Sequence, residues 1–332
     1  MKNIFTIRIL FMGMLVLASV LFSPSVVWSQ DIEAYTEAIR WNPNDAGVYF
    51  NRGNAYAMKG EHDKAIADFT QAIRLNPDFV EAHFNRGLLF VHKNDYNKAI
   101  ADFTQVIHLN PVDANAFYSR GIIYANMGEN NKAIEDFSQS IYINPYAAVV
   151  YYSRGIMYAN IGENNKAIAD FTQAIEFNPN FIEAYFNRGN AYSKNNDFNR
   201  AIADFTEVIR FNPNHANAYF NRGNVHANRQ NYDKAIEDFS QAIRLDPNYA
   251  DAYFNRGNIH FKQSNYNMAI ADYTQTIRLN PSYDVYNNRG NAYFNLQNFD
   301  KAIEDFEASL RINQNHANAK ANLEKAKQLR GW

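Results

Sequence analysis

The sequence predicts an all-α protein built as a solenoid of antiparallel helix pairs. Prolines recur every 34 residues, and each period holds two short amphipathic stretches. An Arg-Gly pair recurs with the same step, except that the last copy follows after 33 residues. A fixed period of this size is typical of stacked repeats that bury their apolar faces against one another. The prolines are Pro43, Pro77, Pro111, Pro145, Pro179, Pro213, Pro247 and Pro281, and the glycines are Gly53, Gly87, Gly121, Gly155, Gly189, Gly223, Gly257 and Gly290.

Each repeat is numbered by places that begin with place 1, which is Ala46 in the first repeat. This numbering shows the two helices of a repeat. Places 4, 8 and 11 share one face of a first helix, and places 20, 24 and 27 share one face of a second. Proline at place 32 ends the second helix. Helices of about 13 residues are marginal alone in water, so each depends on its neighbours. Place 15 carries a residue that permits the turn between the helices, at Gly60, Asn94, Gly128, Gly162 and Asn196.

The chain divides into four predicted segments. Residues 1–29 form a secretory signal peptide, residues 30–45 a half-repeat consisting of a second helix, residues 46–316 eight full repeats, and residues 317–332 a capping helix. The half-repeat covers the first full repeat, and the polar last helix has Leu323, Ala326 and Leu329 on one side. Such end caps keep a solenoid soluble.

The order of residues within one repeat resembles the tetratricopeptide repeat (TPR) family. The resemblance implies a right-handed superhelix with a concave groove, acting as a non-enzymatic binding scaffold. Arginine stands where the family has leucine, and Ser140 and Gln314 also depart from its pattern. The matching residues of the first repeat are Tyr49, Gly53, Tyr56, Ala65, Phe69, Ala72 and Pro77.

The N-terminus predicts export to the periplasm or the medium. Lys2 and Arg8 precede an uncharged run, Ile9 to Phe22, and Val27-Trp28-Ser29 offers a cleavage site. The alternative is an uncleaved anchor, but the run is shorter than the roughly 20 residues that span a bilayer. No span is predicted in the mature chain.

The composition argues against several classes of function. A net charge of −2 does not favour nucleic acid, and the absence of cysteine excludes disulfides and Cys-based zinc sites. No catalytic motif occurs, so we predict no enzyme, no cofactor and no metal. His226 and His260 share place 11, where we interpret them as core residues; a metal pair is the alternative.

A ligand groove is predicted opposite the core face of the first helices. Place 5 forms an aromatic stripe, which we expect to be at least partly exposed; packing between neighbouring first helices is the alternative. Place 9 adds carboxamides and, in repeats two to four, an apolar patch. The place 5 residues are Phe50, Phe84, Tyr118, Tyr152, Phe186, Phe220 and Phe254, and those at place 9 are Asn54, Leu88, Ile122, Ile156, Asn190, Asn224 and Asn258.

The resemblance adds place 6, which peptide-binding members use, at Asn51, Asn85, Asn187, Asn221 and Asn255. Aromatic rings and carboxamides suit an extended peptide, so a protein or peptide ligand is expected. A cell-envelope glycan is the alternative partner, with a role in polysaccharide binding or assembly. A chaperone-tail clamp is rejected because place 5 is aromatic instead of basic.

The repeated arginine at place 7 is predicted to be structural. It and the aspartate at place 23 lie at matching heights on the same side of each helix pair, so we expect an ion pair, within the pair or to a neighbour. The expected pairs are Arg52–Asp68, Arg86–Asp102, Arg120–Asp136, Arg154–Asp170, Arg188–Asp204, Arg222–Asp238, Arg256–Asp272 and Arg289–Asp305.

Overall fold

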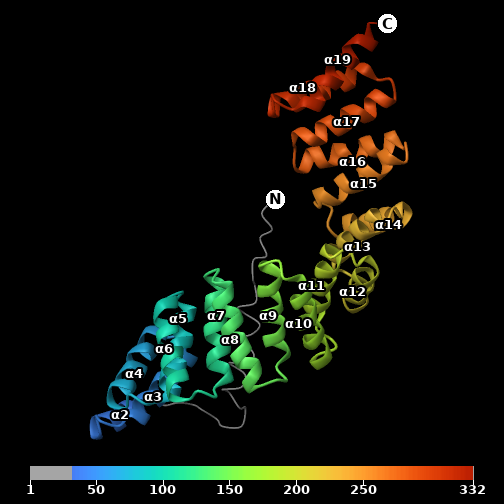
Figure 1. The fold of residues 1–332 in the computed structure, drawn as a ribbon. Coiled ribbons are helices and arrows are strands. Elements are labelled where there is room, and N and C mark those ends of the chain that lie inside the picture. Colours follow the sequence, from blue (N-terminus) through green and yellow to red (C-terminus); the bar gives the residue numbers. More distant parts are fainter. Residues whose placement is uncertain (1–31, 332) are drawn as a thin grey trace. The chain divides into compact units, whose positions relative to one another are not determined.

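The computed structural model describes residues 32–331, which form eighteen α-helices and no strand (Figure 1). The described residues divide into two compact bodies, residues 32–179 and residues 180–331, here called the N-terminal and C-terminal bodies. The predicted signal peptide lies outside the described residues. Its cleavage therefore stays a prediction.

The N-terminal body holds one single helix and four helix pairs. Its helices are α2 (Ile32–Trp41), α3 (Ala46–Met58), α4 (His62–Leu75), α5 (Val80–His92), α6 (Tyr96–Leu109), α7 (Ala114–Asn126), α8 (Asn130–Ile143), α9 (Ala148–Asn160) and α10 (Asn164–Phe177).

The C-terminal body holds four more pairs and a last single helix. Its helices are α11 (Ile182–Lys194), α12 (Phe198–Phe211), α13 (Ala216–Asn228), α14 (Tyr232–Leu245), α15 (Ala250–Lys262), α16 (Tyr266–Leu279), α17 (Tyr283–Asn295), α18 (Phe299–Ile312) and α19 (Ala317–Arg330).

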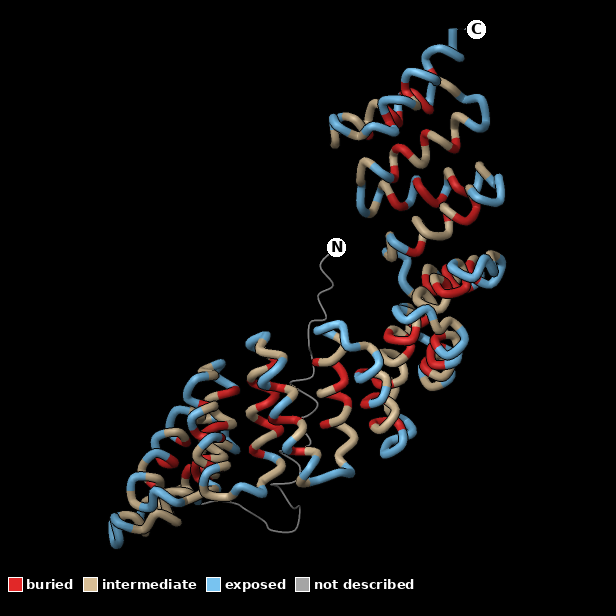
Figure 2. The backbone as a smooth tube through the Cα atoms, viewed as in Figure 1, coloured by how far each residue is buried: buried red, intermediate tan, exposed pale blue. Residues whose placement is uncertain are grey.

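The core of each pair is an aromatic ring against a glycine. The aromatic residue at place 24 of the second helix is fully buried in every repeat, as at Phe69 and Phe137. A Cβ on Gly121 would lie 2.7 Å from Cε1 of Phe137, so only glycine lets the two helices approach this closely. Buried residues therefore follow the contact faces of the helix pairs (Figure 2).

The turn inside each helix pair requires a residue with a left-handed backbone conformation. Place 15 has a positive φ in all eight repeats of the described chain, at Gly60, Asn94, Gly128, Gly162, Asn196, Gln230, Ser264 and Gln297. The sequence indicated the first five of these. The last three are residue types that adopt this conformation less readily, so the helix packing on both sides imposes the turn.

The last helix covers the final repeat. Leu323 and Ala326 of α19 pack with Phe306 of α18, while Leu329 remains 39% exposed. Lys327 also bonds Glu307 at 3.1 Å, on the helix that α19 covers. The capping surface is therefore smaller than the sequence indicated.

Two departures from the repeat pattern have a structural reason. The Ser140 hydroxyl donates to the Ala114 carbonyl at 2.9 Å, so a buried serine replaces alanine without an unpaired group. Tyr273 stands where other repeats have phenylalanine, and its hydroxyl donates to Oδ1 of Asn258 at 2.8 Å. Burial raises the pKa of Tyr273.

Candidate ligand groove and its scaffold

The repeated arginine is bound inside its own helix pair. Its Nε and Nη2 donate to both carboxylate oxygens of the place 23 aspartate at 2.7–3.0 Å, and the aspartates are 3–5% exposed. All eight predicted pairs form, from Arg52–Asp68 to Arg289–Asp305, and the alternative of an aspartate in a neighbouring repeat does not occur. This bidentate geometry leaves the arginine committed to the scaffold.

The same guanidinium also joins one repeat to the next. Its Nη1 donates to the hydroxyl at place 25 of the preceding second helix at 2.9–3.1 Å. Sequence reasoning missed this bond, although a Thr or Ser sixteen residues before the arginine, or fifteen before Arg289, was visible. The bonds are Arg52–Thr36, Arg86–Thr70, Arg120–Thr104, Arg154–Ser138, Arg222–Thr206, Arg256–Ser240 and Arg289–Thr274.

The aromatic stripe at place 5 is half-buried in most repeats. Phe50, Phe84, Phe186, Phe220 and Phe254 have intermediate exposure. Each ring also contacts the core ring at place 24, as Phe84 contacts Phe103 with centroids 5.4 Å apart. The stripe therefore extends the core and still presents part of each ring at the surface.

The apolar patch predicted in repeats two to four is largely covered, which corrects the expected exposure. Tyr118, Ile122, Tyr152 and Ile156 are only 5–8% exposed, whereas Leu88 is half-buried. Repeats three and four carry Ser at place 6 and Ile at place 9, where most others have Asn. Smaller and apolar neighbours allow the rings to be buried. Burial also raises the pKa of Tyr118.

Carboxamides at places 6 and 9 bond one another between repeats. In the C-terminal body Asn221 donates to Asn190 and Asn255 to Asn224, both at 2.8 Å, and Asn288 donates to Asn258 at 3.3 Å. We call this series the asparagine ladder. The N-terminal body has one such bond, from Asn85 to Asn54 at 2.9 Å.

The ladder leaves part of each carboxamide available to a ligand. A carboxamide can donate two hydrogen bonds and accept two, and one ladder bond uses a single N–H and one acceptor site. The place 6 and place 9 members named above have intermediate exposure. Asn51 is exposed, and Asn187 is half-buried and makes interactions of its own.

The two candidate metal ligands belong to the core. His226 and His260 are 7% and 8% exposed, and burial lowers the pKa of both. No group of three metal-ligating side chains occurs within residues 32–331. The imidazoles therefore fill the place that tyrosine or phenylalanine occupies in the other repeats.

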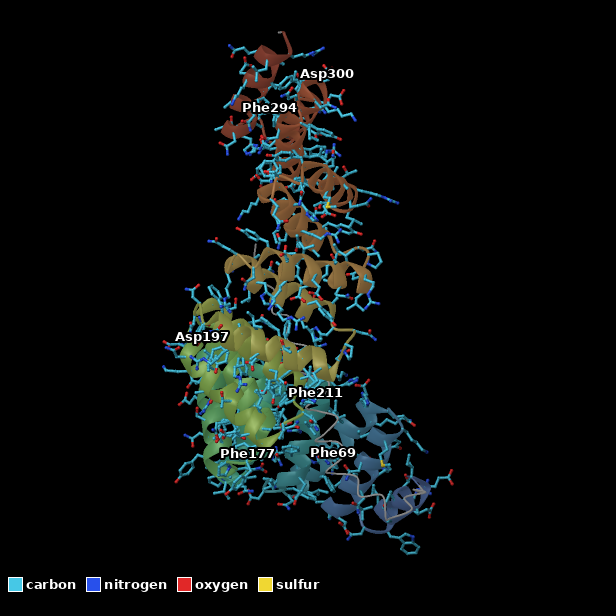
Figure 3. The ribbon with its side chains drawn as sticks, turned by 90° about the vertical axis from the view of Figure 1, so that its right-hand side faces the viewer. Phe69, Phe177, Asp197, Phe211, Phe294 and Asp300 are labelled. Carbon is cyan, nitrogen blue, oxygen red and sulfur yellow. The ribbon has the colours of Figure 1, made fainter. Side chains whose placement is uncertain are left out.

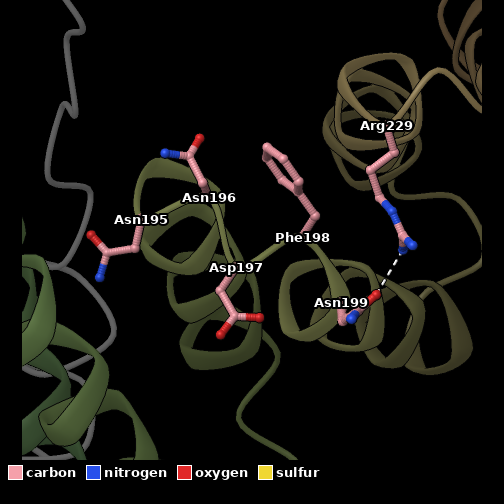
Figure 4. Close-up of a pocket in the computed structure, with 6 residues that line it drawn as sticks. All are labelled: Asn195, Asn196, Asp197, Phe198, Asn199 and Arg229. Atoms are coloured by element: carbon pink, nitrogen blue, oxygen red, sulfur yellow. Dashed lines mark hydrogen bonds between the residues drawn. The ribbon is translucent and has the colours of Figure 1, made fainter.

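A shallow depression at the α11–α12 turn is polar and open (Figure 4). Asn196, Asp197, Phe198 and Asn199 line it, and Arg229, the C-cap residue of α13, donates to Oδ1 of Asn199 at 2.7 Å. Arg200 of α12 donates to the carboxylate of Asp197, the N-cap residue of the same helix. The charged groups here are used within the fold, and the depression adds nothing to the groove.

The comparisons with known families agree with this architecture. Models described as "TPR repeat" match residues 53–92, 87–128, 157–196 and 227–264, and models described as "Tetratricopeptide repeat" match residues 34–67, 114–146, 182–215, 205–237, 250–283 and 283–316. The chain belongs to the tetratricopeptide repeat family. The prediction of a TPR solenoid is therefore confirmed for the described helices. No curated protein matches the chain.

Solved structures of TPR proteins resemble the chain. YrrB, described as "a TPR protein with an unusual peptide-binding site", is 26% identical with a TM-score of 0.52, over 55% of this chain and 95% of YrrB. A TPR protein from Parabacteroides merdae is 21% identical with a TM-score of 0.55, covering 75% of this chain and 98% of its own. The C-terminal part of one from Cytophaga hutchinsonii is 16% identical with a TM-score of 0.64, covering 72% and 99%.

Proposed function

We propose that the chain binds an extended peptide segment of a partner protein along the first helices of the C-terminal body. The asparagine ladder carries this proposal. Successive ladder bonds, from Asn221 and Asn255, repeat along α11, α13 and α15, with the half-buried ring of Phe220 or Phe254 on the same helices. An extended backbone presents donors and acceptors in alternation, which carboxamides can match.

The likeness to YrrB gives independent support, since that protein has a peptide-binding site. The covered rings of repeats three and four argue against a ligand over Tyr118 and Tyr152. The C-terminal body is the better candidate because its ladder is longer. Aromatic contact area supplies affinity, and the carboxamides align the peptide backbone.

The test uses residues that the chain itself tolerates. Asn190→Ile, Asn224→Ile and Asn258→Ile together place at place 9 the residue found at Ile122 and Ile156. Tyr273→Phe is added to this triple variant because the buried Tyr273 hydroxyl donates to Asn258, and the repeats with Ile carry Phe at that place. The variant is therefore expected to fold, as checked by circular dichroism. Linear peptides are first selected from a random library against the wild-type chain, and their affinities for both proteins are then compared by fluorescence anisotropy.

We expect the triple variant to lose at least about tenfold in affinity, because several hydrogen bonds of about 0.5–1.5 kcal/mol each disappear. Asn267→Ile, an exposed change on the second helix α16, is the control and should bind as the wild type does. Equal affinity of the triple variant would reject the groove. Capture of oligosaccharides without any selected peptide would favour the glycan alternative.

We also propose that the chain acts outside the cytoplasm, from the charge and hydropathy pattern of residues 1–29. No helix among residues 32–331 is long and apolar enough to cross a membrane. Intact mass of the purified chain tests cleavage before Gln30, and a periplasmic reporter fusion tests export. Retention of residues 1–29 on an exported chain would instead indicate an anchor.

A further inference from the structure

An exposed aromatic cluster lies at one end of helices α8, α9 and α10 in the N-terminal body. Phe177, the last residue of α10, contacts Tyr146 with ring centroids 5.7 Å apart and contacts Tyr151 at the same distance. Tyr146 is 76% exposed and Phe177 is 37% exposed. Figure 3 labels Phe177. We call Tyr146, Tyr151, Phe177 and the adjacent Glu176 the aromatic–acidic patch.

The next repeat has an equivalent ring with a cation over it. Phe211 is the equivalent of Phe177, and Tyr185, the equivalent of Tyr151, contacts it with centroids 6.0 Å apart. The guanidinium of Arg210 lies 4.2 Å above the Phe211 ring and is held there by Glu207 at 2.8 Å. In that repeat the chain supplies its own cation to the aromatic pair.

The aromatic–acidic patch carries a negative charge where the next repeat has the positive charge of Arg210. Glu176 replaces Arg210, and Gln173, which donates to Glu176 at 2.7 Å, replaces Glu207. No cation lies over the Phe177 ring among the residues that the structure describes. Tyr146 adds a second exposed ring. Its place carries Asn or Asp in the half-repeat and in five of the other repeats, at Asn44, Asp78, Asn180, Asn214, Asn248 and Asn315.

We propose that the aromatic–acidic patch binds an arginine side chain of a basic partner segment, in the position that Arg210 fills over Phe211. The exposed faces of Phe177 and Tyr146 attract a cation, and the Glu176 carboxylate can accept its hydrogen bonds. Arginine suits the site better than lysine because a planar guanidinium can stack on a ring and pair with a carboxylate together. This surface is separate from the asparagine ladder and does not depend on the groove.

The test probe is a fluorescein-labelled peptide of alternating Gly and Arg, with a Gly–Gln peptide as the neutral control, measured by anisotropy at low salt. Glu176→Arg with Tyr146→Asn restores the residue types of the other repeats and should place a cation over Phe177 from within the chain. Affinity for the Arg probe should fall about tenfold, because an exposed cation–π contact and an ion pair are both lost. Glu237→Arg makes the same charge change on the exposed face of α14 and should have little effect.

A gain of binding provides the reverse test. Arg210→Glu uncovers Phe211 and creates a second site, so the amount of probe bound should rise. Arg244→Glu carries the same charge change beside Leu245, where no ring is present, and should leave binding unchanged. Equal probe affinity of the wild type and the Glu176→Arg, Tyr146→Asn variant would overturn the proposal, as would equal gains from the two glutamate variants.

Two further measurements separate the aromatic–acidic patch from the groove and from self-association. The triple Asn→Ile groove variant should bind the Arg probe as the wild type does, so the two proposals can fail independently. Sedimentation velocity tests the chain for self-association. Self-association that disappears in the Glu176→Arg variant would mean that a second copy supplies the arginine and would overturn the assignment to a partner segment.

Discussion

Replacing Arg120 tests directly whether the repeated arginine is structural. Arg120 binds both oxygens of Asp136 at 2.8 Å and the Thr104 hydroxyl at 3.0 Å. Arg120→Met keeps most of the side-chain length and its packing while removing the charge. The Asp136 side chain, 6% exposed, then loses its ion-pair partner.

The expected loss of unfolding free energy is about 3 kcal/mol. Removing one member of a buried ion pair costs about 3–5 kcal/mol because the other charge stays buried and unpaired. The lower end applies because the Arg120 side chain is 17% exposed, so water reaches the site. A second substitution, Asp136→Leu, removes the stranded charge and should recover part of the loss.

Stability is measured by urea unfolding followed by circular dichroism, with hydrogen exchange reporting the loss locally in α7 and α8. Repeat arrays can unfold in several steps, so the local measurement decides. Arg244→Met, which removes an exposed arginine bonded to Gln241, is the control and should change stability by less than about 0.5 kcal/mol. The structural role of Arg120 is refuted if its replacement costs no more than this control, or if the added Asp136→Leu recovers nothing.

Two further outcomes follow from the core of the repeats. In thermal unfolding, Gly121→Ala should lower the free energy of unfolding by about 1–2 kcal/mol more than Gly87→Ala does. The added Cβ would lie 2.7 Å from the Phe137 ring at Gly121, but 3.2 Å from the nearest ring atom at Gly87. Equal stabilities of the two variants would contradict this. Burial lowers the pKa of His226 and His260, so the unfolded chain binds protons first and stability should fall as the pH drops below about 6.5. Replacing both by Tyr should reduce the fall of the unfolding free energy between pH 7 and pH 5. An unchanged pH dependence would show that these imidazoles do not titrate with unfolding.

The scaffold could be predicted from the sequence because it repeats. The constant step located the helices, and equal angles on two paired helices predicted the partners of Arg52 and of its equivalents. The bond from Arg52 to Thr36 was missed because it depends on the stacking of one repeat on the next. Angles on a single helix do not contain that information.

The groove was less predictable for the same reason. Tyr118 and Tyr152 occupy the same place as Phe84, yet they are buried and Phe84 is half-buried. The angle of a residue around its helix predicts the side on which the side chain lies, but not which neighbouring residues cover that side chain. The residues at places 6 and 9, such as Ser119 and Ile122, decide the covering. The pairing of Asn221 with Asn190 likewise needs two neighbouring helices.

Departures from the period are therefore the more informative sites for function. An invariant residue such as Arg120 serves a contact that every repeat must make, so its repetition indicates the scaffold. Glu176 and Tyr146 break the period at places whose usual residues are Arg and Asn, and they do so around one ring, Phe177. A departure from the repeat pattern that affected only packing would lie in the core. These residues are exposed, so the change alters what the surface can bind and not how the repeat folds.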